Sequence, residues 1–528
     1  MPLGHFLSRL GQRKSLADLQ KQAAESQLAR SLGWFDLLMI GIGGIIGTGI
    51  FVLTGQAAYE YAGPAVVVSF IVSGVAASFA ALSYAELSSM IPVAGSAYTY
   101  TYATMGEFVA WINGWNLILE YLVGAAAVSV GWSGYVSAFL KHIGAPLPAS
   151  IIDAPVKWDD KAGALVASGA VLNIPAMFVT LLATGLLIFG IRESARVNAV
   201  IVVVKIIVIL LFIFACIGHV DPKNWDPFFP PNEGSFSRYG VTGMLTASTT
   251  VFFAYIGFDA VSTTAQEAKN PQRDLPIGIL GSLAVCTVLY IAVCMVLTGT
   301  LNYKYLSGDH PLSQAVESTG MLWLNIIVEI GAIAGLTSVM LIMLMGQPRI
   351  FFAMAEDGLF PQFARKVHPK YKTPWVTTLI SGIACAVMGG LLPIGILAEM
   401  TSIGTLFAFF LVNIGVLILR KTQPDAPRRF KVPLGPYVVP ILGAAMSLLL
   451  VATATVPTLI RFVVWMLVGM IVYFSYGYRH SVIGNSERAQ GYDVQPSPDM
   501  LEKSQAEYYS KHESVYDNAM ATHPTPLL

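Results

Sequence analysis

The stretch GIGGIIGTGIF, residues 41–51, decides how this chain folds. It holds five glycines within nine residues and lies inside an apolar run, 34–56, that is long enough to cross a lipid bilayer. Glycine lowers the stability of a helix by about 1 kcal/mol per residue relative to alanine. We therefore predict a membrane-spanning helix that unwinds part-way along its length.

A second run has the same character. FFAYIGFDAVS, residues 252–262, places Gly257 two residues before Asp259 inside another membrane-length segment. Gly47 and Gly257 lie 210 residues apart, and two interrupted helices at corresponding positions are typical of an inverted repeat with a midplane binding site. The alternative is that the glycines only allow close helix packing. That alternative stays open for the second run and explains the first glycine cluster poorly.

The composition of the chain is that of an integral membrane protein. Of the 528 residues, 55% are apolar and 12% are charged, whereas a soluble domain carries roughly 25% charged residues. The 31 basic and 31 acidic residues cancel, so no net field attracts nucleic acid. These values exclude a soluble enzyme, a DNA-binding protein and a disordered scaffold. The four cysteines lie in apolar runs and match no metal-binding or disulfide pattern.

Twelve apolar runs of roughly 20 residues follow one another along the chain, and short polar loops separate them. We predict an all-α integral membrane fold with twelve transmembrane helices. The runs are 34–56, 64–90, 106–138, 174–191, 196–218, 240–265, 276–299, 321–347, 375–392, 396–419, 437–456 and 460–478.

The predicted parts of the chain are a cytosolic arm (1–33), two five-helix repeats (34–218 and 240–419), two additional helices (437–478) and a flexible cytosolic tail (482–528). The loops on the side of the termini hold 23 of the Lys and Arg residues and the opposite loops hold 7. Because positive charge is enriched in cytoplasmic loops, we expect both termini in the cytosol of a multi-pass plasma-membrane (cell inner membrane) protein.

Two unwound helices expose backbone groups of both signs at one depth. Free N–H groups attract an anion and free carbonyl groups hold a cation, so a ligand with adjacent carboxylate and ammonium groups fits. An L-amino acid is the simplest such substrate. We place its carboxylate at Thr48 and Gly49, with Gly47 allowing close approach. The carbonyl groups expected to take the amine are those of Ile45, Phe253, Ala254 and Ile256.

Three charged residues lie deep within predicted helices. Lys205 is roughly 13 Å from the cytosolic end of the fifth helix, and it is read either as a structural pin on nearby carbonyl groups or as the carrier of a coupling proton. Glu120 either contacts a cationic substrate side chain, moves protons, or hydrogen-bonds as a neutral acid. Asp259 is expected to cap the helix that resumes after the second break. Closer to helix ends, Glu86, Glu329 and Glu399 are expected to make gate or loop contacts.

The chain contains none of the common catalytic motifs, such as HExxH, GxSxG or a P-loop, and its eight histidines are scattered. We therefore expect no enzyme activity, no cofactor, no metal and no ATP. A gradient must supply the energy for any transport.

Several segments resemble a known family. GIGGIIGTGIFVLTG (41–55) and SYAELSSMIPVAGSAYTYTY (83–102) resemble the amino acid–polyamine–organocation (APC) transporter superfamily. FFAYIGFDAVSTTAQEAKNPQRDLPIGI (252–279) and GQPRIFFAMAEDGLFP (346–361) are similar to its cationic amino acid transporter (CAT) branch and that branch's bacterial proton-coupled relatives. The resemblance extends from about 30 to 480 and implies the LeuT-like fold, a 5+5 inverted repeat in which helices 1 and 6 are broken.

The resemblance also implies roles for individual residues. Glu120 would lie near the substrate side chain. Proton-coupled bacterial members carry a lysine at the position of Lys205, whereas animal members of the branch, which work by facilitated diffusion, lack it. By the family pattern, the substrate site includes Ile45, Thr48, Gly49, Phe253, Ala254 and Ile256.

We therefore expect a secondary active L-amino acid:proton symporter that works by alternating access in the lipid bilayer, as a monomer. One alternative is a proton-independent exchanger or uniporter of cationic amino acids, and another is a membrane sensor that binds an amino acid without moving it. Relatives of this kind take either small neutral or cationic amino acids, and the single acid Glu120 is compatible with both.

Overall fold

The computed structural model describes residues 10–15, 19, 30–91, 96–159, 164–189, 195–371 and 373–485. Most of the predicted arm at 1–33 and nearly all of the predicted tail at 482–528 therefore lie outside the described residues.

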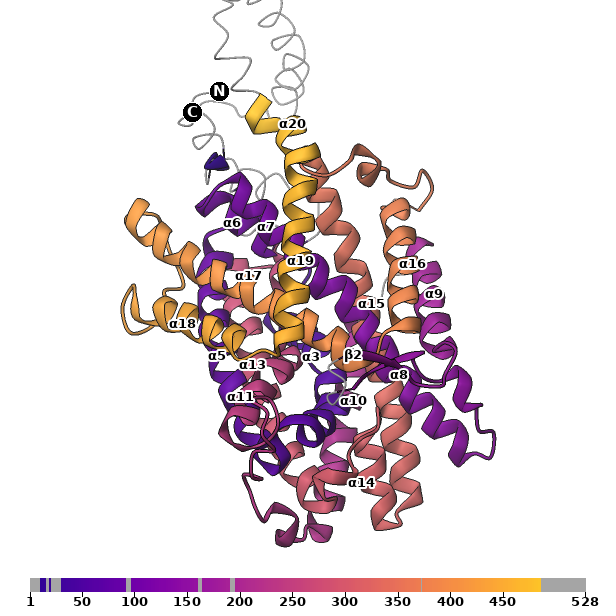
Figure 1. The fold of residues 1–528 in the computed structure, drawn as a ribbon. Helices are drawn as coiled ribbons and strands as arrows, with labels where there is room; N and C mark the ends of the chain where they lie inside the picture. The colour runs from indigo at the N-terminus through magenta and orange to yellow at the C-terminus, as the bar shows by residue number, and fades with distance from the viewer. Residues whose placement is uncertain are drawn as a thin grey trace, which may run out of the picture.

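Helices make up nearly all of the regular structure (Figure 1). In the first half they are α3 (Trp34–Ile45), α4 (Thr54–Ala57), α5 (Val66–Met90), α6 (Ser96–Thr104), α7 (Glu107–Ile118), α8 (Gly124–His142), α9 (Ile174–Ile188) and α10 (Ala195–Cys216). In the second half they are α11 (Gly240–Val251), α12 (Ala260–Thr263), α13 (Pro271–Thr300), α14 (Pro311–Thr319), α15 (Leu322–Glu356), α16 (Trp375–Leu391), α17 (Ile394–Thr422), α18 (Val438–Ala452), α19 (Val456–Val472) and α20 (Tyr478–His480).

Every one of the predicted membrane runs contains helix. Among the described residues, eight helical stretches are long and apolar enough to cross a membrane, and four shorter apolar helices accompany them. The architecture is that of a multi-pass membrane protein, while the number of spans and their inverted-repeat arrangement stay predictions.

One loop departs from the all-helical prediction. Strands β1 (Val156–Asp159) and β2 (Ala164–Ala167) pair antiparallel, with Val156 opposite Ala167. Four-residue strands carry too little alternation to be recognised from sequence.

Helices that hold the same position in the two predicted repeats pack against each other. Helix α5 packs on α13, α8 on α15, and α9 on α16. A two-fold relation between the halves would produce this pairing.

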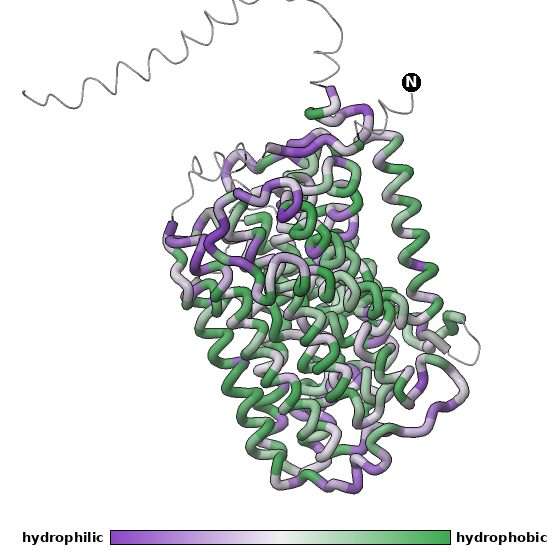
Figure 2. Tube along the Cα trace, turned by 90° about the vertical axis from the view of Figure 1, so that its left-hand side faces the viewer, coloured by the Kyte–Doolittle hydropathy of each residue, from purple (hydrophilic) through white to green (hydrophobic). Residues whose placement is uncertain are grey.

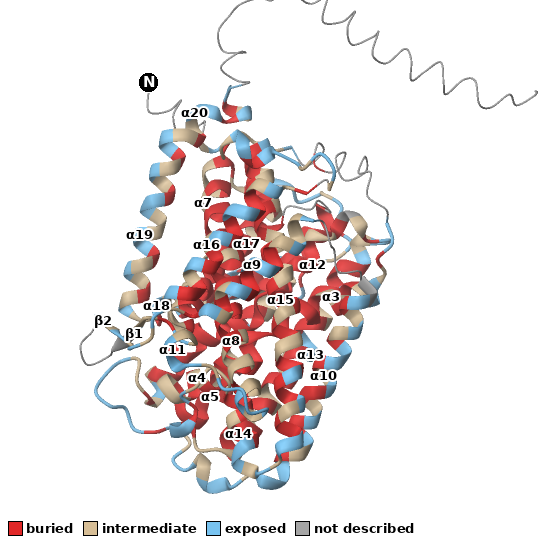
Figure 3. Cartoon of the chain, turned by 90° about the vertical axis from the view of Figure 1, so that its right-hand side faces the viewer, coloured by how far each residue is buried: buried red, intermediate tan, exposed pale blue. Residues whose placement is uncertain are grey.

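Burial separates central helices from peripheral ones (Figure 3). Of the most apolar 18 residues in Glu107–His142, 83% are buried, whereas the corresponding share in Val456–His480 is 22%. The outer surfaces are apolar along the helices, and hydrophilic residues gather at the loops (Figure 2). Exposed apolar side chains over whole helices are suited to contact with lipid.

Stacked tryptophans hold the peripheral helix α19 to the bundle. Trp115 of α7 stacks on Trp465 of α19 with ring centroids 4.6 Å apart, and its indole N–H donates to the Trp465 carbonyl. Trp111 Nε1 donates to the carbonyl of Gly469 at 3.0 Å. The indole N–H groups of Trp111 and Trp115 are thereby satisfied.

The described ends of the chain meet on one face of the molecule. Lys14 Nζ lies 2.7 Å from a carboxylate oxygen of Asp357, just past the end of α15. The Val482 amide donates to the backbone carbonyl of the same aspartate at 3.1 Å. We call this side the terminal face.

Candidate functional site

The first glycine-rich helix is interrupted within the membrane-length segment. Helix α3 ends at Ile45, Ile46 takes an extended conformation (ψ 97°), and helical structure resumes as a π-helical turn, Gly49–Leu53. The hydroxyl of Thr48 is buried at this break and has no hydrogen-bond partner among the described residues. A buried hydroxyl without a partner is uncommon, so the break presents a polar atom that a ligand could use.

The second break has a different backbone form. Helix α11 passes into a 3₁₀ turn, Phe252–Tyr255, and Ile256 is extended (ψ 140°). Gly257 follows with φ +116°, a value that L side chains rarely adopt. Helix resumes at α12.

The two breaks lie directly against each other. A Cβ atom added at Gly49 would lie 2.3 Å from Cα and Cβ of Ala254, and one at Gly257 would lie 2.6 Å from the carbonyl group of Gly44. The chain therefore brings together residues about 200 positions apart. The predicted site residues around this contact are nearly inaccessible: Ile45, Thr48, Phe253, Ala254 and Ile256.

The space beside Gly47 belongs to another helix. A Cβ atom at Gly47 would lie 2.9 Å from Cγ2 of Val339 in α15. The close approach at this glycine is therefore to α15, so the close approach of a substrate at Gly47 stays a prediction.

A tyrosine that the sequence analysis missed joins the two breaks. The hydroxyl of Tyr290 in α13 lies 2.7 Å from the carbonyl oxygen of Ile45 and 2.7 Å from that of Ala254. Because a hydroxyl has one hydrogen, it can donate to only one of the two oxygens at a time. A lone tyrosine in an apolar run follows no motif, and its polar group at membrane depth was the only available signal.

Lys205 reaches the first break from α10. Its ammonium nitrogen lies 3.0 Å from the carbonyl oxygen of Gly43 and 3.1 Å from that of Ile46, and the side chain is fully buried. The ammonium group therefore contacts carbonyl groups at the end of α3, where the helix dipole favours a cation. The lysine links α10 to the unwound part of α3.

Glu120 meets Asp259 in the interior. Glu120 lies on a π-helical turn, Leu119–Val123, and its buried carboxyl group faces the Asp259 carboxyl group and the Thr405 hydroxyl. The Tyr121 hydroxyl donates to Asp259 at 2.9 Å. Two neighbouring buried carboxylates cannot both be ionised without a large free-energy cost. The pair is therefore suited to a shared proton or to a cationic group.

The expectation that Asp259 caps the resuming helix is wrong. Asp259 occupies the position before α12, but its side chain makes no capping hydrogen bond. Its carboxylate instead accepts the Tyr121 hydroxyl, because that donor lies within reach at the same depth.

The sequence itself matches known transport proteins. A family model described as amino acid permease covers residues 32–476, which include both breaks and Lys205. The chain belongs to the amino acid permease family. Branched-chain amino acid permease BcaP of Bacillus subtilis (strain 168) is 48% identical over 89% of this permease and 98% of that protein.

Other relatives carry different names. The methylthioribose transporter of the same bacterium is 45% identical over 90% of this permease and 100% of that protein. Human cationic amino acid transporter 4 is 36% identical over 81% of this permease and 66% of that protein. The resemblance to the APC superfamily and its CAT-like members is thus confirmed, and the permease is an amino acid transporter rather than an enzyme.

Proposed function

We propose that this permease is an L-amino acid:proton symporter that works by alternating access on a LeuT-like 5+5 inverted repeat. The observation that carries the proposal is the contact of the Lys205 ammonium group with the Gly43 and Ile46 carbonyl groups. It joins a protonatable side chain to the helix break at which the substrate would bind.

The substrate would bind through its backbone groups. Its carboxylate would accept hydrogen bonds from the Thr48 hydroxyl, which has no partner among the described residues, and from the Gly49 amide. Its ammonium group would donate hydrogen bonds to the carbonyl oxygens of Ile45 and Ala254. These two oxygens share the one hydroxyl hydrogen of Tyr290.

The proton would act through Lys205. A protonated ammonium group holds α10 against the end of α3, and loss of the proton removes the charge that attracts the carbonyl dipoles. Protonation would then set how firmly the first break is held, and the gradient would supply the energy without a cofactor or ATP.

A neutral aliphatic amino acid is the substrate class we propose. The side chains at the breaks include Ile45, Phe253 and Ile256, and the relative BcaP is named a branched-chain amino acid permease. The second candidate is a cationic amino acid, because the Glu120 and Asp259 carboxyl groups could pair with its side chain and several relatives are named cationic amino acid transporters.

Uptake into proteoliposomes tests the proposal. Purified permease should accumulate labelled leucine against its gradient when the outside is acidic, and Lys205→Ala should lose that proton dependence. Lys223→Ala removes an exposed lysine and serves as the control. Full proton dependence in Lys205→Ala would overturn the role of Lys205, downhill flux alone would indicate a uniporter or exchanger, and binding without flux would indicate a sensor.

Competition identifies the side chain that the site accepts. Each of the common amino acids, and methylthioribose, is added unlabelled against labelled leucine. Strong competition by isoleucine and valine is expected for the proposed class, whereas competition by arginine and lysine alone would favour the second candidate.

A further inference from the structure

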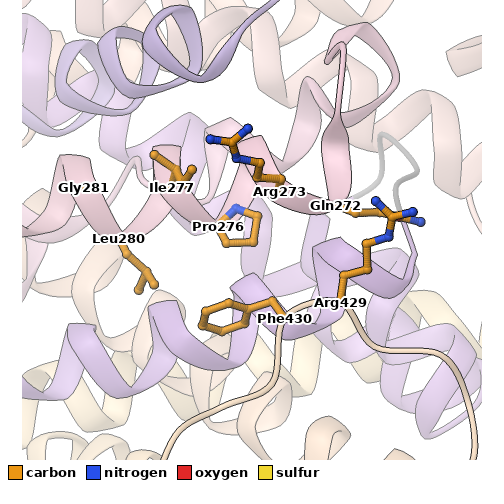
Figure 4. Close-up of a pocket in the computed structure, with 8 residues that line it drawn as sticks. All are labelled: Gln272, Arg273, Pro276, Ile277, Leu280, Gly281, Arg429 and Phe430. Atoms are coloured by element: carbon orange, nitrogen blue, oxygen red, sulfur yellow. The ribbon is translucent and has the colours of Figure 1, made fainter.

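A cavity of about 590 Å³ lies between the start of α13 and the loop after α17 (Figure 4). Its lining includes Arg273, Pro276, Ile277 and Leu280 at the start of α13, and Arg429 and Phe430 from the loop after α17. The backbone amide of Leu32 donates to the carbonyl of Glu267 just before α13, which places the cavity beside the N-terminal segment.

Two arginines border this cavity from different elements (Figure 4). Arg273 lies in the first turn of α13 and Arg429 in the loop before α18, and both are exposed. In the described part of the chain, neither guanidinium group forms an ion pair with an acidic side chain. Two positive charges therefore lie at the border of the cavity, with their guanidinium groups directed apart (Figure 4), and neither is paired with an acid among the described residues.

The loop that carries Arg429 is held in place by its neighbour. Arg428 is buried, and its Nε lies 3.3 Å from Glu86 of α5. Arg420 lies 2.6 Å from the same carboxylate, which also accepts the Val432 amide at 2.9 Å. These contacts fix the backbone on both sides of Arg429, so this wall of the cavity is preorganised.

An apolar stripe leads from the arginines along α13 toward the middle of the membrane-length helix. Ile277, Gly281, Ala284 and Val288 follow one another at spacings of four, three and four residues, which places them on one face of the helix. Ile277 is 37% exposed and Val288 is 67% exposed. The stripe is open to lipid where the cavity ends.

We propose that this cavity binds an anionic phospholipid, with its headgroup at the border that carries Arg273 and Arg429 and an acyl chain along the α13 stripe. Arginine is suited to phosphate because its N–H groups bind two oxygens at once. Basic pockets between helices at the membrane surface recognise anionic headgroups in this way. A free anion could bind the arginines, but it would make no apolar contact with Leu280, Phe430 or the stripe.

Native mass spectrometry of the purified full-length permease tests the site. The protein in detergent receives phosphatidylglycerol, phosphatidylcholine with the same acyl chains, or inorganic phosphate. Wild-type protein should retain phosphatidylglycerol in preference to the other two. In the double variant Arg273→Ala/Arg429→Ala, the fraction of protein that retains phosphatidylglycerol should fall about tenfold. Each basic residue near a membrane surface adds substantially to the binding of anionic lipid.

A matched control separates a site from general positive charge. Lys366→Ala/Lys421→Ala removes two exposed lysines outside the cavity lining and should keep wild-type retention. Unchanged retention in the arginine variant, equal losses in both variants, equal retention of phosphatidylcholine, or retention of inorganic phosphate alone would each overturn the proposal. This readout needs no transport, so its failure is distinguishable from failure of the proposed symport.

Discussion

At the scale of single residues, the helix breaks depend on glycines for space rather than for flexibility alone. Gly49 leaves room for Ala254, and Gly257 both leaves room for the Gly44 carbonyl group and adopts a positive φ. A methyl group at Gly49 would overlap the backbone of the other break, which cannot move as a side-chain end can.

Replacing Gly49 by alanine is therefore expected to separate the breaks. We expect Gly49→Ala to reduce substrate uptake by tenfold or more, because overpacking typically costs about 1–3 kcal/mol. Uptake by purified protein in liposomes is the measurement. Gly185→Ala in α9 is the control, since its Cβ would meet no atom within 4 Å, and equal activity of the two variants would contradict the role of the contact.

Some of these residues could be predicted from sequence and others could not. The glycine cluster and Lys205 are unusual in an apolar membrane helix, so each can be recognised from the sequence alone. Tyr290 and the meeting of Glu120 with Asp259 depend on how distant helices pack, which no local pattern records.

At the scale of elements, buried ion pairs join helices to loops. Glu86, near the end of α5, binds Arg420 in the last turn of α17 and Arg428 in the loop that follows, and thereby ties α5 to both. This is the kind of loop contact that the sequence predicted for Glu86, although its partners lie more than 300 residues away.

Neutralising that acid should destabilise the protein. Glu86→Gln leaves buried Arg428 without a charged partner, and breaking a buried pair costs about 3–5 kcal/mol. Thermal unfolding in detergent should show a clearly lower Tm. Glu233→Gln breaks the exposed pair with Arg238 and should change stability by less than about 1 kcal/mol. A Tm for Glu86→Gln equal to that of wild type would refute the assignment.

A pH effect is expected where the loop before α14 meets α4. Burial, with the nearby charge of Asp153, raises the pKa of Asp309 to about 7, and Gln56 donates to its carboxyl group at 3.3 Å. The folded protein thus binds this proton more tightly than the unfolded chain, whose aspartate pKa is about 4. The stabilisation is complete below about pH 4 and is lost as the pH rises through 7.

Thermal unfolding at several pH values checks this effect. The Tm of wild-type protein should fall by a few degrees between pH 5 and pH 8, and Asp309→Asn should flatten that slope. Burial lowers the pKa of the adjacent His310 to about 4, so this histidine stays neutral over the range. An unchanged slope in Asp309→Asn, or the same flattening in the exposed-loop variant Asp425→Asn, would rule out Asp309 as the source.

Predicted and observed elements differ mostly at their ends. Helix α15 continues to Glu356, beyond the predicted end at 347, because Phe351 and Met354 are buried and continue the apolar face past the charged residues. Helix α14 was not predicted, since its nine residues are too few and too polar to resemble a span.

At the scale of the whole molecule, both described ends lie on the terminal face and the loop between α10 and α11 lies on the opposite face (Figure 1). The excess of Lys and Arg on the terminal side predicts that this face is cytosolic. The order of helices could be predicted because hydropathy is local, but their lateral packing could not.

Thiol labelling in intact cells tests this orientation. The native cysteines, Cys216, Cys286, Cys294 and Cys385, are all buried and should give a low background. Ser235→Cys should react with a membrane-impermeant maleimide in intact cells, and Asn485→Cys should react only after permeabilisation. The reverse pattern would invert the predicted topology.

The Tyr290 hydroxyl has a consequence for which solutes the protein admits. The carbonyl oxygens of Ile45 and Ala254 compete for one hydrogen, so at any moment the Tyr290 hydroxyl leaves the partial negative charge of one of them unbalanced. A protonated amine brings three hydrogens and can neutralise that charge. A solute with only acceptor groups would leave that charge unbalanced. Selection for amines therefore begins at a backbone carbonyl oxygen, before the side chain of the substrate is recognised.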